Sequence, residues 1–391
     1  MYEVFWTALR LGLTAFGGPI AHLGYFERTY VRRLRWLGSE EFASLVALCQ
    51  TLPGPTSSQV GFLIGRHRAG WPGALAAWVG FTLPSAVLMY AFAVLPLRNS
   101  GGLMDPILHG LMVTAVAVVA QAVWSMARGL CPDWPRRLIA ALSGVVLLLA
   151  ANPSLQLAVM IFGAIAGLLL CRIARNNASE CPTRDESRRI AGGALLLYTL
   201  LLAAFGTISL LAAHGPVSLA AVFYRAGALV FGGGHVVLPL LRQELVPSGW
   251  LSDNAFLSGY GLAQGLPGPL FTVAAYLGAA SAPAHLSALW ACIALAAIFL
   301  PGLLLAAGGA SLWNLLAHIR GASAALAGIN ASVVGILGAA FYDPVWRSGV
   351  RDPVDVGVAL VAFALLQRWR FSAPVVAALC VAVSLLREHF L

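Results

Sequence analysis

The chain contains intervals without any charged residue that are longer than a soluble domain could bury. The longest, from Asn254 to Ile319, has 66 uncharged residues in a row, and only 10% of all 391 residues are charged. Soluble domains carry roughly 25% charged residues. Backbone polar groups inside a bilayer must be paired within the chain, and runs of about 20 apolar residues suit helices that cross it. The sequence therefore predicts an all-α integral membrane protein.

Helix-breaking and polar residues divide these intervals. The 34-residue interval from Leu138 to Cys171 is split by Asn152-Pro153, so two short helices fit it better than one long helix. The strongly polar stretch from Arg172 to Arg189 reads as a linker between two parts of the chain. Each part then holds about five to six hydrophobic segments of membrane-spanning or shorter length.

The two parts are repeats of one another. Arg10, Gly12 and Phe16-Gly17-Gly18 recur as Arg225, Gly227 and Phe231-Gly232-Gly233. Further matches in the same order pair Trp36-Leu37 with Trp250-Leu251, Gln50 with Gln264, Pro53-Gly54-Pro55 with Pro267-Gly268-Pro269, Pro84 with Pro301, and Gly110 with Gly328. This series predicts two homologous halves, residues 1–175 and 215–391. Residues 176–214 join them and hold the arginine-rich linker and one connecting transmembrane segment.

Repeats with matching Gly/Pro-broken segments are typical of secondary transporters, whose substrate binds at the breaks. After Pro55, the residues Thr56, Ser57 and Ser58 open a new half-helix, whose N–H groups and positive dipole end suit an anion. Thr272 follows Pro269 in the same way. A single PGP could also be a kink or a surface turn, and the glycine runs could serve tight helix packing.

Arginine inside an apolar segment is costly and marks a functional site by default, and its guanidinium binds oxyanions with two hydrogen bonds. Arg10 and Arg225 fit this description, although Arg10 could instead extend to the membrane interface. His22 is either a pH-sensitive ligand or a packing residue. The predicted binding residues are Arg10, Gly17, Gly18, His22, Gln50, Pro53, Gly54, Pro55, Thr56, Ser57, Ser58, Arg225, Gly232, Gly233, Gln264, Pro267, Gly268, Pro269 and Thr272.

The arginines predict the topology through the positive-inside rule. Arg28 to Arg35 lie before the first PGP segment, and Arg66 and Arg68 lie after it. Both groups fall on the cytoplasmic side if the segment re-enters at Pro53-Gly54-Pro55 and turns back. With Ile190 to Ala213 as one crossing of the membrane, this interpretation makes the two halves parallel; a PGP segment that crosses fully would make them inverted.

The sequence lacks the residues that several classes of enzyme require. All 24 basic residues are arginines, so a phosphate-binding Walker A loop, which needs lysine, is excluded. The six cysteines form no CxxC pair, and no HExxH or GxSxG motif occurs. We therefore expect no enzymatic activity, no cofactor, no metal site and no nucleic-acid partner.

Long ordered motifs resemble the chromate ion transporter (CHR) family in its long, two-domain form. They comprise Phe16-Gly-Gly-Pro-Ile-Ala-His22-Leu-Gly-Tyr25-Phe26, Leu48-Cys-Gln-Thr-Leu-Pro-Gly-Pro-Thr-Ser-Ser-Gln-Val-Gly61, Ala69-Gly-Trp-Pro-Gly-Ala-Leu-Ala-Ala-Trp-Val-Gly-Phe-Thr-Leu-Pro-Ser85, Phe231-Gly-Gly-Gly234 and Gln264-Gly-Leu-Pro-Gly-Pro269.

The resemblance implies export of chromate from the bacterial cytoplasm across the inner membrane, which confers chromate resistance. It implies sulfate as a competing anion, the membrane potential or proton motive force as the driving force, and oppositely oriented halves. A homodimer is one oligomeric state that we expect such a protein can form. The alternatives are a sulfate or molybdate transporter, an anion channel and, less in keeping with the sequence, a membrane redox enzyme.

Overall fold

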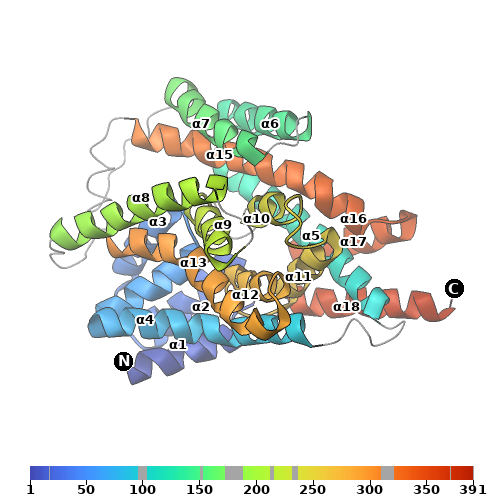
Figure 1. Ribbon diagram of the computed structural model, residues 1–391, viewed down its shortest axis with the longest axis horizontal. Helices are drawn as coiled ribbons and strands as arrows, with labels where there is room; N and C mark the ends of the chain where they lie inside the picture. The colour runs from blue at the N-terminus through green and yellow to red at the C-terminus, as the bar shows by residue number, and fades with distance from the viewer. Residues whose placement is uncertain are drawn as a thin grey trace.

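The computed structural model describes residues 1–16, 18–95, 104–149, 153–171, 188–211, 215–230, 237–309, 321–369 and 371–390 (Figure 1). In these ranges the regular elements are helices, and no strand occurs. Five helices there are long and apolar enough to cross a membrane: Thr56–Val94, Asp105–Leu130, Ile190–Thr207, Ala284–Ala307 and Ser323–Gly349. The predicted all-α membrane fold is confirmed.

The helices follow the predicted segments. The first half holds α1 (Tyr2–Thr14), α2 (Gly18–Phe26), the π-helix η1 (Glu27–Arg33), α3 (Ser39–Thr51), α4 (Thr56–Val94), α5 (Met104–Leu130), α6 (Trp134–Leu149) and α7 (Pro153–Leu170). The connecting helix is α8 (Arg188–Leu211). The second half holds α9 (Pro216–Ala228), α10 (Val237–Leu245), α11 (Asp253–Gly265), η5 (Leu270–Thr272), α12 (Val273–Ala280), η6 (Ala284–Leu286), α13 (Ser287–Ala307), α15 (Ala322–Ala340), η7 (Phe341–Trp346), α16 (Arg347–Gly349), α17 (Pro353–Gln367) and α18 (Ala373–Phe390). The predicted break at Asn152-Pro153 separates α6 from α7.

The long helix α4 consists of two helices joined by a tight turn. Ala69 and Gly70 have non-helical backbone angles, and Gly70 has φ +65°. A Cβ on Gly65 would overlap the carbonyl oxygen of Gly73, so the parts before and after the turn pack directly against each other. The second part, from Trp71 to Val94, is about 36 Å long at 1.5 Å per residue and can span the bilayer by itself.

Arg68, at the end of the first part of α4, marks one face of the molecule. Its guanidinium carbon lies 5.5 Å from the ring centre of Trp36, which precedes α3, and its Nη2 lies 3.2 Å from Glu3 Oε2 at the start of α1. The starts of α1 and α3 and the end of this part of α4 therefore share one face, which we call the arginine-rich face because it also holds Arg66. The first PGP segment enters the molecule and turns back, as predicted.

The second half has the same architecture in the opposite orientation. Tyr90 Oη, late in α4, lies 3.3 Å from Ser287 Oγ at the start of α13, whereas Arg66 donates to the carbonyl of Ala307 at the end of α13 (3.0 Å). The second part of α4 and α13 are repeat counterparts, and they run antiparallel. The halves are therefore inverted.

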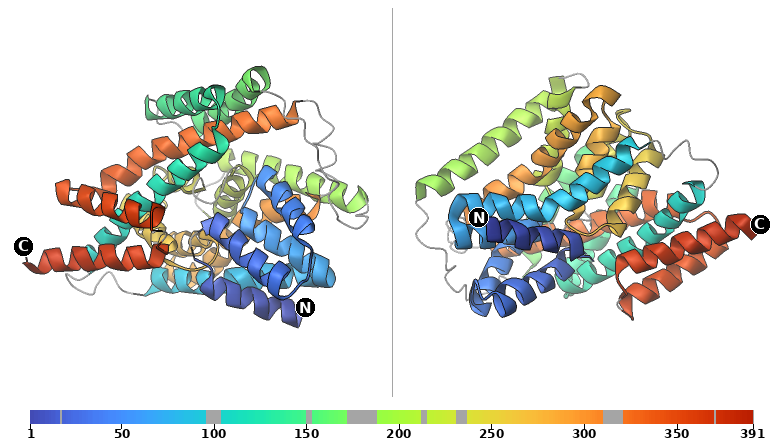
Figure 2. Two further views of the ribbon diagram at one scale, coloured as in Figure 1. Left: turned by 180° about the vertical axis from the view of Figure 1, so that it is seen from behind. Right: turned by 90° about the horizontal axis from the view of Figure 1, so that it is seen from below.

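The expectation of parallel halves is wrong, although the re-entrant PGP segment is right. That expectation counted the first hydrophobic segment as a crossing. However, Glu3 in the first turn of α1 pairs with Arg68, and the chain returns beside Arg68 at Trp36, so α1 and α2 also turn back. In Figure 2, α1 and α4 lie side by side next to the N-terminus. Gly18, with φ +77°, allows this second re-entrant turn. Charge patterns cannot detect the turn because both of its ends lie at one face.

Outside the broken segments, α6 and α7 pack on α15 (Figure 1). Glycines permit the close approach: a Cβ on Gly328 would overlap the carbonyl oxygen of Gly163. We expect Gly328→Ala to lower the melting temperature of the detergent-solubilised protein, because overpacking costs about 1–3 kcal/mol. Gly338→Ala on the same helix is the control, since a Cβ there meets no atom within 4 Å. Equal melting temperatures for both variants would contradict the packing described here.

Candidate functional site

The two PGP turns cross over to the opposite half of the chain. The Gly54 N–H donates to the carbonyl of Val230 (2.8 Å), which follows α9, and the Gly268 N–H donates to the carbonyl of Ala15 (2.9 Å), which caps α1. Each turn thereby satisfies a carbonyl left free at a helix end of the other repeat. We call the buried region in which each PGP turn contacts the opposite half the PGP crossing.

Both turn glycines need to be glycines. Gly54 has φ +120° and Gly268 has φ +95°, which side chains rarely tolerate. A Cβ on Gly54 would lie 2.8 Å from the Cα of Gly302, and a Cβ on Gly268 would lie 3.0 Å from the Cβ of Ser85. Ser85 and Gly302 directly follow the repeat-matched prolines, so each PGP turn rests on the same point of the opposite long helix.

Side chains fix these turns. Gln59 Nε2 donates to the carbonyls of Pro53 (2.9 Å) and Gly302 (3.0 Å). Thr272 Oγ1 donates to the carbonyl of Pro269 (2.8 Å) and lies 2.6 Å from Ser85 Oγ, which must then supply the proton of their shared bond. Each half thus contributes one side chain that ties its PGP turn to the long helix of the other half.

The first turn of α4 is the most polar buried place in this crossing. Thr56, Ser57 and Ser58 have exposed fractions of 9%, 3% and 2%. The N-cap residue, Pro55, contributes no side-chain hydrogen bond to the first N–H groups, and within the described residues Ser58 Oγ has no hydrogen-bond partner. The site offers N–H and O–H donors at a positive helix end, the arrangement that binds oxyanions.

His22 completes this end of α4. Its Nδ1 lies 3.3 Å from Ser57 Oγ, its ring meets the Phe81 ring edge-on at 5.3 Å, and it is 1% exposed. The Ala15 carbonyl that accepts the Gly268 N–H also lies beside the His22 ring. The structure therefore brings together the predicted residues His22, Gly54, Pro55, Thr56, Ser57 and Ser58 with Gly268 of the other half.

The corresponding helix start in the second half differs. It begins as the short 3-10 helix η5, and Leu270 and Phe271 fill the space near it with exposed fractions of 8% and 1%. The hydroxyl of Thr272 is already committed to Ser85 and Pro269. The two PGP turns are equivalent in backbone but not in the donors that they present.

Other predicted residues lie elsewhere. Arg10 is exposed on α1, and Gln50 is exposed on α3. Arg225 donates to Glu244 Oε2 of α10 at 2.8 Å. Gly18 begins α2 at φ +77°, and Pro53, Pro267 and Pro269 belong to the two PGP turns. Gly17, Gly232 and Gly233 and the side chain of Gln264 lie outside the described residues. A binding role for Arg10, Arg225 and Gln50 stays a prediction.

The ion pair of Arg225 and Glu244 joins α9 to α10 at side-chain exposures of 21% and 36%. We expect Arg225→Gln and Glu244→Gln each to lower the melting temperature, and the double variant to lose less than the sum, with a coupling of about 0.5–3 kcal/mol. Arg10→Gln, at an exposed position, is the control and should leave the melting temperature unchanged. Additive losses would mean that the ion pair does not stabilise the protein. Transport by the folded double variant then decides whether Arg225 also binds substrate.

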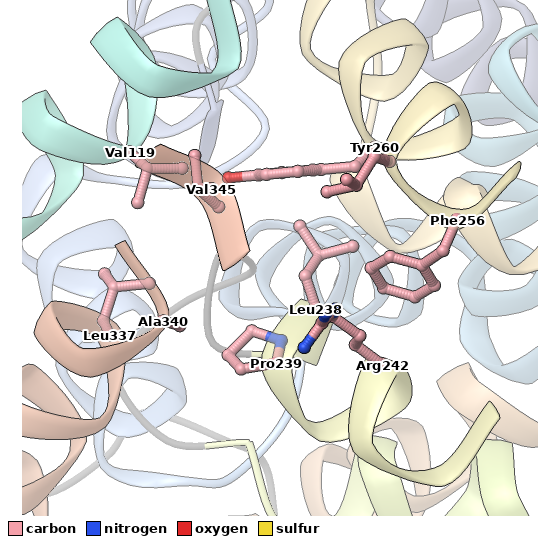
Figure 3. Close-up of a pocket in the computed structure, with 10 residues that line it drawn as sticks. Val119, Leu238, Pro239, Arg242, Phe256, Tyr260, Leu337, Ala340 and Val345 are labelled. Carbon is pink, nitrogen blue, oxygen red and sulfur yellow. The ribbon is translucent and has the colours of Figure 1, made fainter. Parts of the chain in front are cut away.

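A cleft with about 310 Å³ of empty space, open to solvent, lies between α5, α10, α11, α15 and η7 (Figure 3). The side chain of Tyr260 reaches across it toward Val119 and Val345. Arg242 also lines it but is held by two hydrogen bonds to Asp253, at 2.7 and 2.9 Å. Apart from the Tyr260 hydroxyl, its other lining side chains are apolar, so this cleft offers few donors to a dianion.

Sequence reasoning missed Gln59 and Ser85. Gln59 lies four residues after Pro55 within the quoted motif, and Ser85 follows Pro84, one of the repeat-matched prolines. Both residues lie in or beside motifs that the sequence makes visible. The hydrogen-bond partner of a polar residue inside a helix, however, can be identified only when the positions of the neighbouring helices are known.

Comparisons with known proteins agree on one family. A family profile described as chromate transporter matches residues 2–168 and 217–385. The "Chromate transport protein" of Pseudomonas aeruginosa is 28% identical and covers 97% of this chain and 90% of its own length. That of Cupriavidus metallidurans is 27% identical, covering 95% and 89%. The "Probable chromate transport protein" of Synechococcus elongatus is 26% identical, covering 93% and 88%. No solved structure matches the chain.

Proposed function

Because this chain belongs to the chromate transporter family, we propose that it exports chromate from the cytoplasm and thereby confers chromate resistance. The chain is a multi-pass membrane protein, in keeping with the bacterial inner membrane. The observation that carries the proposal is the buried start of α4, where Thr56, Ser57 and Ser58 present donors beside the crossing of the two PGP turns.

The site suits a tetrahedral oxyanion such as chromate. Its donors are neutral hydroxyl and N–H groups at a positive helix end, and Asp355, the one buried acidic side chain within the described residues, belongs to α17 rather than to this crossing. A dianion is held there without a carboxylate to repel it. Sulfate is also a tetrahedral dianion, so we expect it to compete with chromate for the site.

The inverted halves support alternating access. α1, α2, α3 and the first part of α4 turn back from the arginine-rich face, while their counterparts in the second half turn back from the opposite face. Rocking of one half against the other would expose the crossing to each side in turn. We place the arginine-rich face in the cytoplasm by the positive-inside rule.

The energetics favour export. One charge moving through 100 mV is worth about 2.3 kcal/mol, so a dianion leaving a negative interior gains about 4.6 kcal/mol, equivalent to a gradient on the order of 10³. The membrane potential is therefore sufficient as a driving force, and proton exchange is an additional option.

The test is chromate uptake by everted membrane vesicles, with an imposed potential, an imposed pH gradient, or excess sulfate. Vesicles from the same host without the protein are the control. We expect saturable uptake that follows the potential and is inhibited by sulfate. Accumulation of sulfate or molybdate without chromate would overturn the substrate assignment. Flux that does not saturate with chromate concentration would indicate a channel. Reduction of chromate by the purified protein would indicate a redox enzyme.

A further inference from the structure

A second polar cluster lies away from the PGP crossing, where the first turns of α5 and α17 meet the end of α18. It consists of His109, Asp352, Asp355 and Arg387. His109 and Asp355 are 7% and 4% exposed, and Asp355 is the one acidic side chain that is buried within the described residues. Ionisable groups buried in membrane proteins are expensive and by default functional.

Asp355 is the centre of the cluster. Its Oδ1 lies 3.0 Å from His109 Nε2 and 3.3 Å from Arg387 Nη1, and its Oδ2 accepts the Arg351 N–H at 2.8 Å. Because a carboxylate only accepts, His109 Nε2 carries the hydrogen of their bond. Arg387 also pairs with Asp352, the N-cap residue of α17.

The formal charges of the cluster would be balanced by one additional proton. Two carboxylates share one guanidinium, so the cluster has one excess negative charge while His109 is neutral. His109 Nδ1 is buried and, within the described part of the chain, has no hydrogen-bond partner. The nearby charged groups Asp105, Arg351 and Glu388 are exposed, and Arg347 pairs with Asp343. A proton bound by His109 or Asp355 would neutralise the cluster at its two buried members, whereas the side chains of Asp352 and Arg387 are 29% and 32% exposed.

The cluster is connected to the candidate anion site through α5. Gly110, next to His109, packs against the backbone of Val381 in α18, and Leu111 packs against Gly261 of α11. α11 ends at Gly265, just before the second PGP turn. A shift of α5 would therefore act directly on α11, the helix that precedes this turn.

Among the described residues of the first half, no equivalent cluster occurs. At the start of α6, the counterpart of α17, Asp133 pairs with Arg136, and the Asp133 side chain is 45% exposed. In the part of the chain that the structure describes, the buried acid therefore occurs only in the second half, which is not expected of a residue that merely supports the repeat architecture.

We propose that His109 and Asp355 form a proton-binding site that couples anion export to proton entry. One proton binds from the face opposite the arginine-rich face and is released at the arginine-rich face as the anion moves outward. This proposal rests on the proposed function and supplies its coupling ion.

The experiment uses the full chain in everted vesicles at zero membrane potential. With an acidic lumen, we expect chromate uptake by the unaltered protein to be several-fold faster than without a pH gradient, accompanied by proton efflux detected with a lumenal pH dye. Asp355→Asn should lose at least tenfold of both the pH-driven stimulation and the proton flux, while uptake driven by an imposed potential remains. Asp133→Asn is the matched control and should behave like the unaltered protein.

Two further variants separate coupling from folding. Asp355→Glu keeps a titratable carboxyl group and should retain proton flux with a shifted pH profile, and His109→Gln should reduce the proton flux. Retention of full proton flux by Asp355→Asn would overturn the proposal. Chromate uptake by the unaltered protein without any response to the pH gradient would overturn it too and leave the proposed function intact, whereas no chromate uptake under any condition would overturn the proposed function itself.

Discussion

Gly54→Ala is expected to reduce chromate uptake at least 100-fold. The new Cβ would lie 2.8 Å from the Cα of Gly302, and neither backbone can yield without moving a helix. The residue would also be held at φ +120°, where strain costs about 1–3 kcal/mol for a non-glycine residue. The turn must then shift, and the bond from the Gly54 N–H to Val230 is lost. The measurement is initial uptake by everted vesicles per amount of folded protein.

The control for this variant is Gly24→Ala in α2, because a Cβ at Gly24 meets no atom within 4 Å. It should transport like the unaltered protein. Gly268→Ala should also lose transport, since it has φ +95° and rests on Ser85. If Gly54→Ala folds and transports at the normal rate, the crossing of the two PGP turns is not needed for transport.

The double variant Ser57→Ala/Ser58→Ala is expected to lose about 100-fold in kcat/KM for chromate. It removes two hydroxyl donors from the start of α4, and a hydrogen bond to a charged group contributes about 1.5–3 kcal/mol. Two such bonds amount to about 3 kcal/mol or more, which corresponds to a factor of about 100. Alanine favours helices and is small, so the melting temperature should fall only by the effect of losing the contact between Ser57 and His22.

Ser281→Ala is the matched control, because its hydroxyl donates to the Leu277 carbonyl at the far end of α12. It should leave both kcat/KM and the melting temperature unchanged. An unchanged kcat/KM in the double variant would show that the anion does not bind at the start of α4. A large loss in the melting temperature instead would assign the two hydroxyls to folding.

Residues that match in the repeat do not have matching partners in the structure. The repeat predicts a role in anion binding for Thr272 and Arg225 by analogy with their first-half counterparts. In the structure the Thr272 hydroxyl ties the turn to Ser85, and Arg225 pairs with Glu244. Matching residues share a backbone position but not a partner: Ser85 belongs to the first half and Glu244 to the second.

The sequence by itself determined the membrane fold, the two homologous halves, the re-entrant PGP turn and the polar helix start at Thr56. These follow from local properties: uncharged length, repeated motifs, and proline and glycine that break helices. Only the tertiary structure decided that the halves are inverted, that Gly54 and Gly268 bond to Val230 and Ala15, and that Asp355 meets His109. Each of these joins residues more than 170 positions apart. Such contacts depend on how the helices pack in three dimensions. The sequence does not predict this packing, because the helices have similar apolar compositions and composition does not identify the neighbour of each helix.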